Sequence, residues 1–189
     1  MAEQIIIYDS CVFYSFTLRS LFVQLAITGL FRAKWSEEIH QEWISSLLRD
    51  RPDLPLEKLI KIKELINKTV PDCLVMNYEP LVESLDLPDA GDRHVLAAAI
   101  QCGAQTIITN NLKDFPKHVL SLFNIEAISP DHFLSDLWDL SPEIILHSLK
   151  KCRERLTNPP FNADEYLQSL TKHGFIKSVA RLRSYHSII

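Results

Sequence analysis

The sequence predicts an α/β domain with a mainly parallel sheet, followed by a helical C-terminal extension. Three observations support this fold class. Short β-branched runs alternate with helical apolar stripes up to about residue 128, which is typical of a parallel sheet covered by helices. Beyond Pro130 only helical patterns occur. A chain of 189 residues with 47% hydrophobic residues suits one ordinary domain with a substantial core.

The first half of the chain combines strands with three helices. The run Ile5-Ile6-Ile7 is β-branched and suits a buried strand. Ser36, with two glutamates behind it, marks a helix start. In order, the expected elements are a strand at residues 4–8, a helix at 18–26, a helix from Ser36 to the break at 50–55, a helix at 56–69 and a short strand at 73–76.

The second half contains a helix that is apolar almost all round. It opens at residues 88–92, and its run from Val95 to Ile100 indicates packing on more than one side. Gly103 ends it. The elements expected after it are strands at residues 105–109 and 125–128 and helices at 116–123, 131–139, 142–156 and 163–173, with a weaker helix beyond.

Composition excludes several classes of protein. Only 4 Gly and 10 Pro exclude collagen-like and low-complexity chains. No apolar run approaches the ~20 residues that a membrane-spanning helix needs. The first residues lack a basic segment and a small-residue cleavage site, and the 4 cysteines include no C-x-x-C pair. We therefore expect a cytoplasmic protein with reduced thiols and no membrane partner.

The net charge of −4 conceals an uneven distribution. Residues 1–146 carry 12 Lys and Arg against 21 Asp and Glu, whereas residues 147–189 carry 8 against 3. A solvated helical face explains the basic segment. The alternative is a basic edge that attracts a polyanion toward an acidic site, which requires chemistry that acts on phosphates.

Acidic residues follow two of the predicted strands. Functional groups in open α/β sheets gather at the carboxyl ends of the strands. Asp9 directly follows the first strand, and Asp114 lies in the segment after the strand at residues 105–109. Asp89 and Asp92 stand at the start of the apolar helix, where capping explains Asp89 well and Asp92 less fully.

Glu42 is a further acidic candidate, because it lies at the edge of the apolar stripe of its helix. A carboxylate at that edge can point into a cleft rather than into water. Glu38, one turn earlier, shares the edge and is the alternative. Arg93 and His94 follow Asp92 and point in different directions, so at most one of them faces the cleft.

Four segments carry a resemblance to a known family. They are IIIYDSCVFY at residues 5–14 with Leu18 and Arg19 behind it, WSEEIHQEW at 35–43, PDAGDRHVLAAA at 88–99 and IITNNLKDFP at 107–116. In this order they resemble the PIN-domain ribonucleases of the VapC-like kind. The resemblance implies a three-layer PIN-like nuclease domain at residues 1–135 and a helical extension at residues 136–189 packed on it.

The resemblance also implies an endoribonuclease that depends on Mg²⁺ or Mn²⁺, often the toxin of a toxin–antitoxin pair. Its partners would be an RNA substrate, a cognate antitoxin protein and a second copy in a homodimer. Asn111 stands where many relatives have a further aspartate, which weakens any second metal site. The family's acidic positions fall on Asp9, Glu42, Asp92 and Asp114, with Asp89 as a companion of Asp92.

Hydrolysis of a phosphodiester needs carboxylates of this kind. A divalent ion neutralises charge on the phosphate and lowers the pKa of its bound water. Mg²⁺ prefers one or two carboxylates plus waters, which leaves positions open for a phosphate. We expect Asp9 and Asp92 to be the principal metal ligands, with Asp114 and Glu42 completing the site or orienting waters. Acids that converge repel one another, so their pKa values should be raised without a cation.

Residues around these acids are expected to have supporting roles. Ser10 and Thr109 border the site, where hydrogen bonding within turns is the alternative to a ligand contact. Arg19 follows the family's pattern and would pair with a carboxylate or contact phosphate, a structural ion pair being the alternative. The basic C-terminal segment would grip the RNA backbone, or would only pack on the nuclease domain.

Two other functions fit parts of the pattern. Aspartyl-phosphate phosphatases also place an aspartate after the first strand, but they need a second one two residues later, where this chain has Cys11. A PIN fold with a weakened site would bind RNA or a protein without cleavage, and Asn111 keeps that alternative open. The nuclease remains our prediction, since a purely structural role leaves the clustered carboxylates unexplained.

Overall fold

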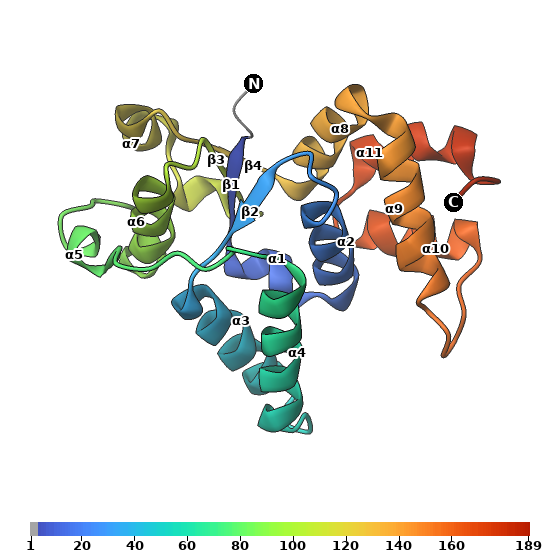
Figure 1. Ribbon diagram of the computed structural model, residues 1–189, viewed down its shortest axis with the longest axis horizontal. Coiled ribbons are helices and arrows are strands. Elements are labelled where there is room, and N and C mark those ends of the chain that lie inside the picture. The colour runs from blue at the N-terminus through green and yellow to red at the C-terminus, as the bar shows by residue number, and fades with distance from the viewer. Residues whose placement is uncertain (1–3) are drawn as a thin grey trace.

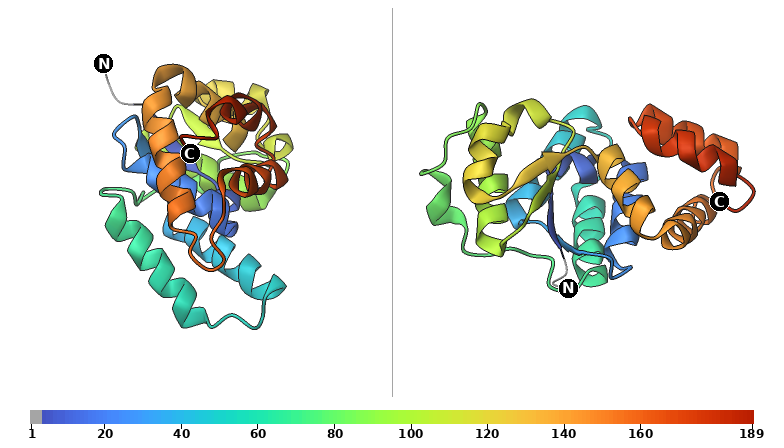
Figure 2. Two further views of the ribbon diagram at one scale, coloured as in Figure 1. Left: turned by 90° about the vertical axis from the view of Figure 1, so that its right-hand side faces the viewer. Right: turned by 90° about the horizontal axis from the view of Figure 1, so that it is seen from above.

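The computed structural model describes residues 4–189 and contains a four-stranded, all-parallel sheet in the order β2-β1-β3-β4 (Figure 1). The strands are β1 (Ile5–Tyr8), β2 (Arg32–Lys34), β3 (Thr106–Ile108) and β4 (Glu126–Ile128). Helix α6 (Arg93–Cys102) covers one face of the sheet and α2 (Phe16–Ala26) the other (Figures 1 and 2). The predicted three-layer α/β fold is confirmed.

The register of β1, β3 and β4 brings their carboxyl ends together. Tyr8 pairs with Ile108, and Ile108 pairs with Ile128. The amide of Asp9 then donates to the Ile108 carbonyl at 3.1 Å, and the amide of Thr109 donates to the Ile128 carbonyl at 3.0 Å. Asp9 and Thr109 therefore leave the sheet at the same edge, as parallel strands require.

Helix α6 is largely buried. Its residues from His94 to Ala99 are all buried, and it packs against β1 and β3 on one side and α5 on the other, which confirms the prediction. Gly103 ends it in the left-handed conformation with φ of 69°. The other helices before the extension are α1 (Ser10–Tyr14), α3 (Glu37–Asp50), α4 (Leu56–Thr69), α5 (Glu79–Val82) and α7 (Lys117–Leu120).

The C-terminal extension is helical and packs against α2 at one end of the molecule (Figure 1). Its helices are α8 (Pro130–Leu140), α9 (Pro142–Glu154), α10 (Ala163–Lys172) and α11 (Ile176–Leu182). The ring centroid of Phe22 on α2 lies 6.1 Å from that of Phe133 and 6.4 Å from that of Phe175. The expected boundary after residue 135 lies inside α8, and all of α8 is counted with the extension from this point on. The division of the chain at residue 135 stays a prediction.

The structure corrects several elements around the sheet. Residues 73–76, expected to be a strand, form only one isolated bridge, between Leu74 and Trp35, so that prediction is wrong. The edge strand next to β1 is β2, which was missed because only one of its 3 residues is apolar. Helices α1 and α5 were missed because 5 and 4 residues are too few to show a periodic stripe. Within residues 4–189 no helix is apolar over a length that would span a bilayer.

Candidate active site

Asp9 stands at the end of β1 and caps the N-terminus of α1. It is 5% exposed, and both of its carboxylate oxygens accept a hydrogen bond. The Ser10 amide donates to Oδ1 at 2.6 Å, and the Thr109 hydroxyl donates to Oδ2 at 2.6 Å. Thr109 Oγ1 in turn accepts from the Asn111 amide at 2.9 Å. The loop after β3 therefore fixes the orientation of the Asp9 carboxylate.

Three other aspartates form a close carboxylate group. Asp89 caps the 3₁₀ turn that leads into α6, where it accepts a backbone hydrogen bond at 2.8 Å, and Asp92 ends that turn. Asp114 ends a second 3₁₀ turn, after β3. One carboxylate oxygen from each of the three lies within 4.8 Å of the others. The structure thus brings Asp89 together with Asp92 and Asp114. Asp9, which we expected to be a principal ligand beside Asp92, lies outside this close group.

Asp92 lacks a partner for its negative charge. Its Oδ2 is buried and has no hydrogen-bond partner in the described residues 4–189. Burial, and after it the charges of Asp9, Asp89, Asp114 and Glu42, raise the pKa of Asp92 to about 6. A divalent cation would give such a buried oxygen a partner and would neutralise the negative charge around it. The residues present therefore fit an oxygen-preferring cation such as Mg²⁺ or Mn²⁺.

Glu42 is linked to α6 through His94. The Nε2 of His94 lies 2.9 Å from Glu42 Oε1, and its Nδ1 lies 3.8 Å from Glu38 Oε2. Burial acts to lower the pKa of His94, but the pairing with Glu42 and the charge of Glu38 outweigh it, so the pKa is raised. Both candidate glutamates therefore contact the same imidazole, and Glu42 is the closer one.

His94 is a site residue that the sequence analysis did not assign. It is 3% exposed, whereas Arg93 points toward Asp86, with 3.7 Å between guanidinium and carboxylate. Of these two neighbours, only His94 thus faces the acids. Its place on the first turn of α6, two residues after Asp92, was the signal that the sequence offered.

Arg19 contacts groups outside the acidic site, whereas Asn111 contacts one of its aspartates. The buried guanidinium of Arg19 donates to the Phe13 carbonyl and lies over the Trp43 ring, 5.1 Å from its centroid. Burial lowers the pKa of Arg19 to about 10, and the described residues give it no carboxylate partner. The side-chain amide of Asn111 donates to Asp114 Oδ2. Arg19 therefore holds α1, α2 and α3 together, and Asn111 orients Asp114.

Comparison with known proteins adds to this geometry. A family model described as PIN domain matches residues 5–113, and one described as VapC50 C-terminal domain matches residues 130–184. The protein of Mycobacterium tuberculosis (strain ATCC 25618 / H37Rv) named "Putative ribonuclease VapC50" is 40% identical over 79 residues. That alignment covers 42% of this chain and 47% of the relative, so the chain spans about half the length of that relative. No solved structure matches the chain significantly.

Proposed function

The chain belongs to the PIN-domain family, and on that premise we propose that it is a metal-dependent endoribonuclease that hydrolyses RNA phosphodiester bonds. The observation that carries the proposal is the buried Oδ2 of Asp92, which has no partner in residues 4–189 and lies among four other carboxylates. The carboxylates of such a group repel one another, so a bound divalent cation stabilises them. A phosphate oxygen is a ligand that such a cation readily takes in addition.

Asp92 and Asp114 would hold Mg²⁺ or Mn²⁺, with Asp89 in the same close group. Asp9, whose charge acts on Asp92, lies beside this group and would complete the site. When bound, the cation would neutralise charge on the scissile phosphate and lower the pKa of a water. The side-chain amide of Asn111 donates to Oδ2 of Asp114, so the other carboxylate oxygen of Asp114 is the one that would bind the cation. This arrangement favours one cation rather than two.

The other residues position reacting groups. Thr109 and Ser10 hold the two oxygens of Asp9, so this carboxylate has a fixed orientation beside the proposed cation site. His94 engages Glu42 through Oε1. The second oxygen of Glu42 is then the acceptor that we assign to the proton of the attacking water, as general base. Arg19 acts through packing, because it holds α1 against Trp43.

A toxin role is part of the same proposal, supported by the match to the VapC50 C-terminal domain. A toxin requires a cognate antitoxin, which we expect to cover the acidic group with an Arg or Lys side chain. We also expect a homodimer, and a solution mass of 21.7 kDa at every concentration would exclude it. A cytoplasmic location stays a prediction.

Cleavage of RNA by the purified protein in Mg²⁺, Mn²⁺ or EDTA tests the proposal, with Asp9→Asn and Asp92→Asn beside the wild type. We expect cleavage with either metal, none in EDTA, and loss in both variants. Glu64→Gln, which removes an exposed carboxylate on α4, should cleave like the wild type. Absence of cleavage and of metal binding would support the alternative, a PIN-fold module that binds RNA or protein without cutting it.

A further inference from the structure

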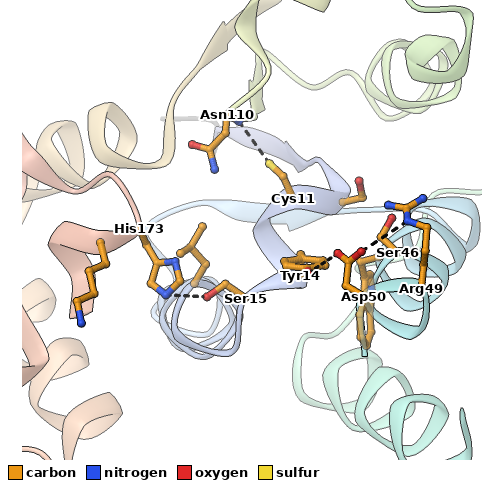
Figure 3. A pocket seen from close by; sticks show the side chains of 12 residues that line it. Cys11, Tyr14, Ser15, Ser46, Arg49, Asp50, Asn110 and His173 are labelled. Atoms are coloured by element: carbon orange, nitrogen blue, oxygen red, sulfur yellow. Dashed lines mark hydrogen bonds and ion pairs between the residues drawn. The ribbon is translucent and has the colours of Figure 1, made fainter. Parts of the chain in front are cut away.

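A cavity of about 500 Å³ lies between the nuclease region and the C-terminal extension. It is lined by α1, the end of α3, the loop after β3 and the end of α10 (Figure 3). Ser10, Cys11 and Asn110 line it, and they are chain neighbours of Asp9 and Thr109. The Asn110 amide donates to Cys11 Sγ at 3.3 Å. The cavity therefore borders the acidic site.

Basic side chains stand on two flanks of this cavity. Arg49 lies at the end of α3, and Lys172 and His173 lie at the end of α10. Figure 3 shows Arg49 and His173 on opposite sides of Tyr14. Asp50, the acid in the lining, is already engaged, because it accepts from the Tyr14 hydroxyl at 2.6 Å and lies 3.7 Å from Arg49. Since Arg49 and Asp50 offset each other, Lys172 leaves the cavity with one excess positive charge beside the group of acids.

His173 fixes the end of α10 against the nuclease region. Its Nε2 lies 3.1 Å from Ser15 Oγ, at the junction of α1 and α2. Burial lowers the pKa of His173, so the ring is neutral at pH 7 and serves as a hydrogen-bonding anchor. The extension therefore places Lys172 at the cavity through a specific contact.

Tyr14 supplies an aromatic surface in the same place. Its side chain is 37% exposed, although it carries a large apolar ring, and its hydroxyl bond to Asp50 holds that ring in position. Proteins bind unpaired bases by stacking them on aromatic rings and bind the backbone through Lys and Arg. An exposed ring between two cations matches a nucleotide with a phosphate on each side.

The geometry points to this cavity as the binding site for one nucleotide of single-stranded RNA next to the scissile phosphate. The base stacks on Tyr14, and Lys172 and Arg49 contact the flanking phosphates. A volume of about 500 Å³ lies in the usual range for small-ligand sites. The inference rests on the proposed nuclease function, and it gives the extension a part in substrate binding.

Binding of a fluorescein-labelled oligouridylate to the full chain, measured by anisotropy in EDTA, tests this inference without cleavage. Lys172→Ala and Arg49→Ala should each raise Kd about fivefold, as loss of one charged contact does. Each should also lower the slope of log Kd against log salt by about 0.7. Lys177→Ala, which removes an exposed lysine of α11 outside the cavity lining, should keep the wild-type Kd and slope.

Tyr14 provides the second arm of the test. Tyr14→Leu should weaken binding about tenfold or more. Tyr14→Phe keeps the ring, loses only the hydroxyl bond to Asp50, and should weaken binding much less than Tyr14→Leu does. Lys172→Ala that binds like Lys177→Ala, or Tyr14→Leu that binds like the wild type, overturns the inference. If either result is found while the wild type cleaves RNA, the nucleotide site is refuted and the proposed ribonuclease function is retained. If the wild type neither binds nor cleaves RNA, both the nucleotide site and the ribonuclease function are refuted.

Discussion

Replacement of Asp92 with asparagine is expected to stabilise the metal-free protein, although it removes a proposed metal ligand. Burial and the charges of four neighbouring acids raise the pKa of the Asp92 carboxyl from 3.8 to about 6. The ionised carboxylate is therefore disfavoured in the folded state and lowers stability at neutral pH. Asparagine has nearly the same shape and no charge, so this loss of stability disappears.

The magnitude follows from the pKa of Asp92. The difference between 3.8 and about 6 corresponds to about 3 kcal/mol between the folded and unfolded states. Asp92 is only half-buried, so solvent screening reduces the expected gain to about 1.5 kcal/mol. For a chain of 189 residues, this gain corresponds to an increase in Tm of about 3–6 °C.

The sign of the pH dependence is also determined. Because the pKa is raised on folding, the folded protein binds this proton more tightly than the unfolded chain does. The Asp92 contribution to wild-type stability therefore falls as the pH rises from about 4 to about 6. The advantage of Asp92→Asn should be complete above about pH 6 and absent below about pH 4.

Thermal unfolding followed by circular dichroism in EDTA, near pH 8 and near pH 4, measures this difference. Glu64→Gln, the control on α4, should unfold like the wild type at both pH values. Addition of Mg²⁺ should raise the Tm of the wild type more than that of Asp92→Asn, because only the wild type keeps the full ligand set. An Asp92→Asn protein less stable than the wild type near pH 8, with Glu64→Gln unchanged, would refute the reasoning.

Three further substitutions test the structure around the site. Thr109→Val removes the hydroxyl that holds Asp9 and should lower the free energy of unfolding, measured in urea, by about 1–3 kcal/mol. Thr109→Ser keeps a hydroxyl and should retain most of the wild-type stability. Equal losses in the two variants would contradict this role of the hydroxyl. His94→Ala removes the partner of Glu42 and should slow single-turnover RNA cleavage about 10- to 100-fold, and an unchanged rate would exclude the positioning role. Phe22→Ala deletes the ring that meets two aromatic rings of the extension and should lower the unfolding free energy by about 3–5 kcal/mol; a loss below about 1 kcal/mol would contradict that packing.

The fold and the edge that carries the site were predictable from local patterns. The Ile5-Ile6-Ile7 run and the strand before Thr109 are apolar and bounded by polar residues, and parallel strands bring their carboxyl ends to one edge. The apolar character of α6 predicted its burial on more than one side. The match of a PIN-domain model to residues 5–113 confirms the family that the four sequence segments resemble.

The side-chain partners were less predictable, because they depend on how distant segments pack. Asp89 joins Asp92 and Asp114 through two 3₁₀ turns, and such turns leave no periodic pattern in a sequence. The contact of His94 with Glu42 requires the packing of α3 near α6. Sequence spacing likewise gave no reason to place Lys172 in one cavity with residues of α1.

The most direct test of the proposed metal site is a crystal structure of the wild-type protein with Mn²⁺, in which anomalous scattering locates the ion. The account predicts one anomalous peak about 2.1 Å from Asp92 Oδ2 and within reach of Asp114, and no such peak in crystals of Asp92→Asn. Absence of a peak among these aspartates, at a Mn²⁺ concentration that supports RNA cleavage, would contradict the account.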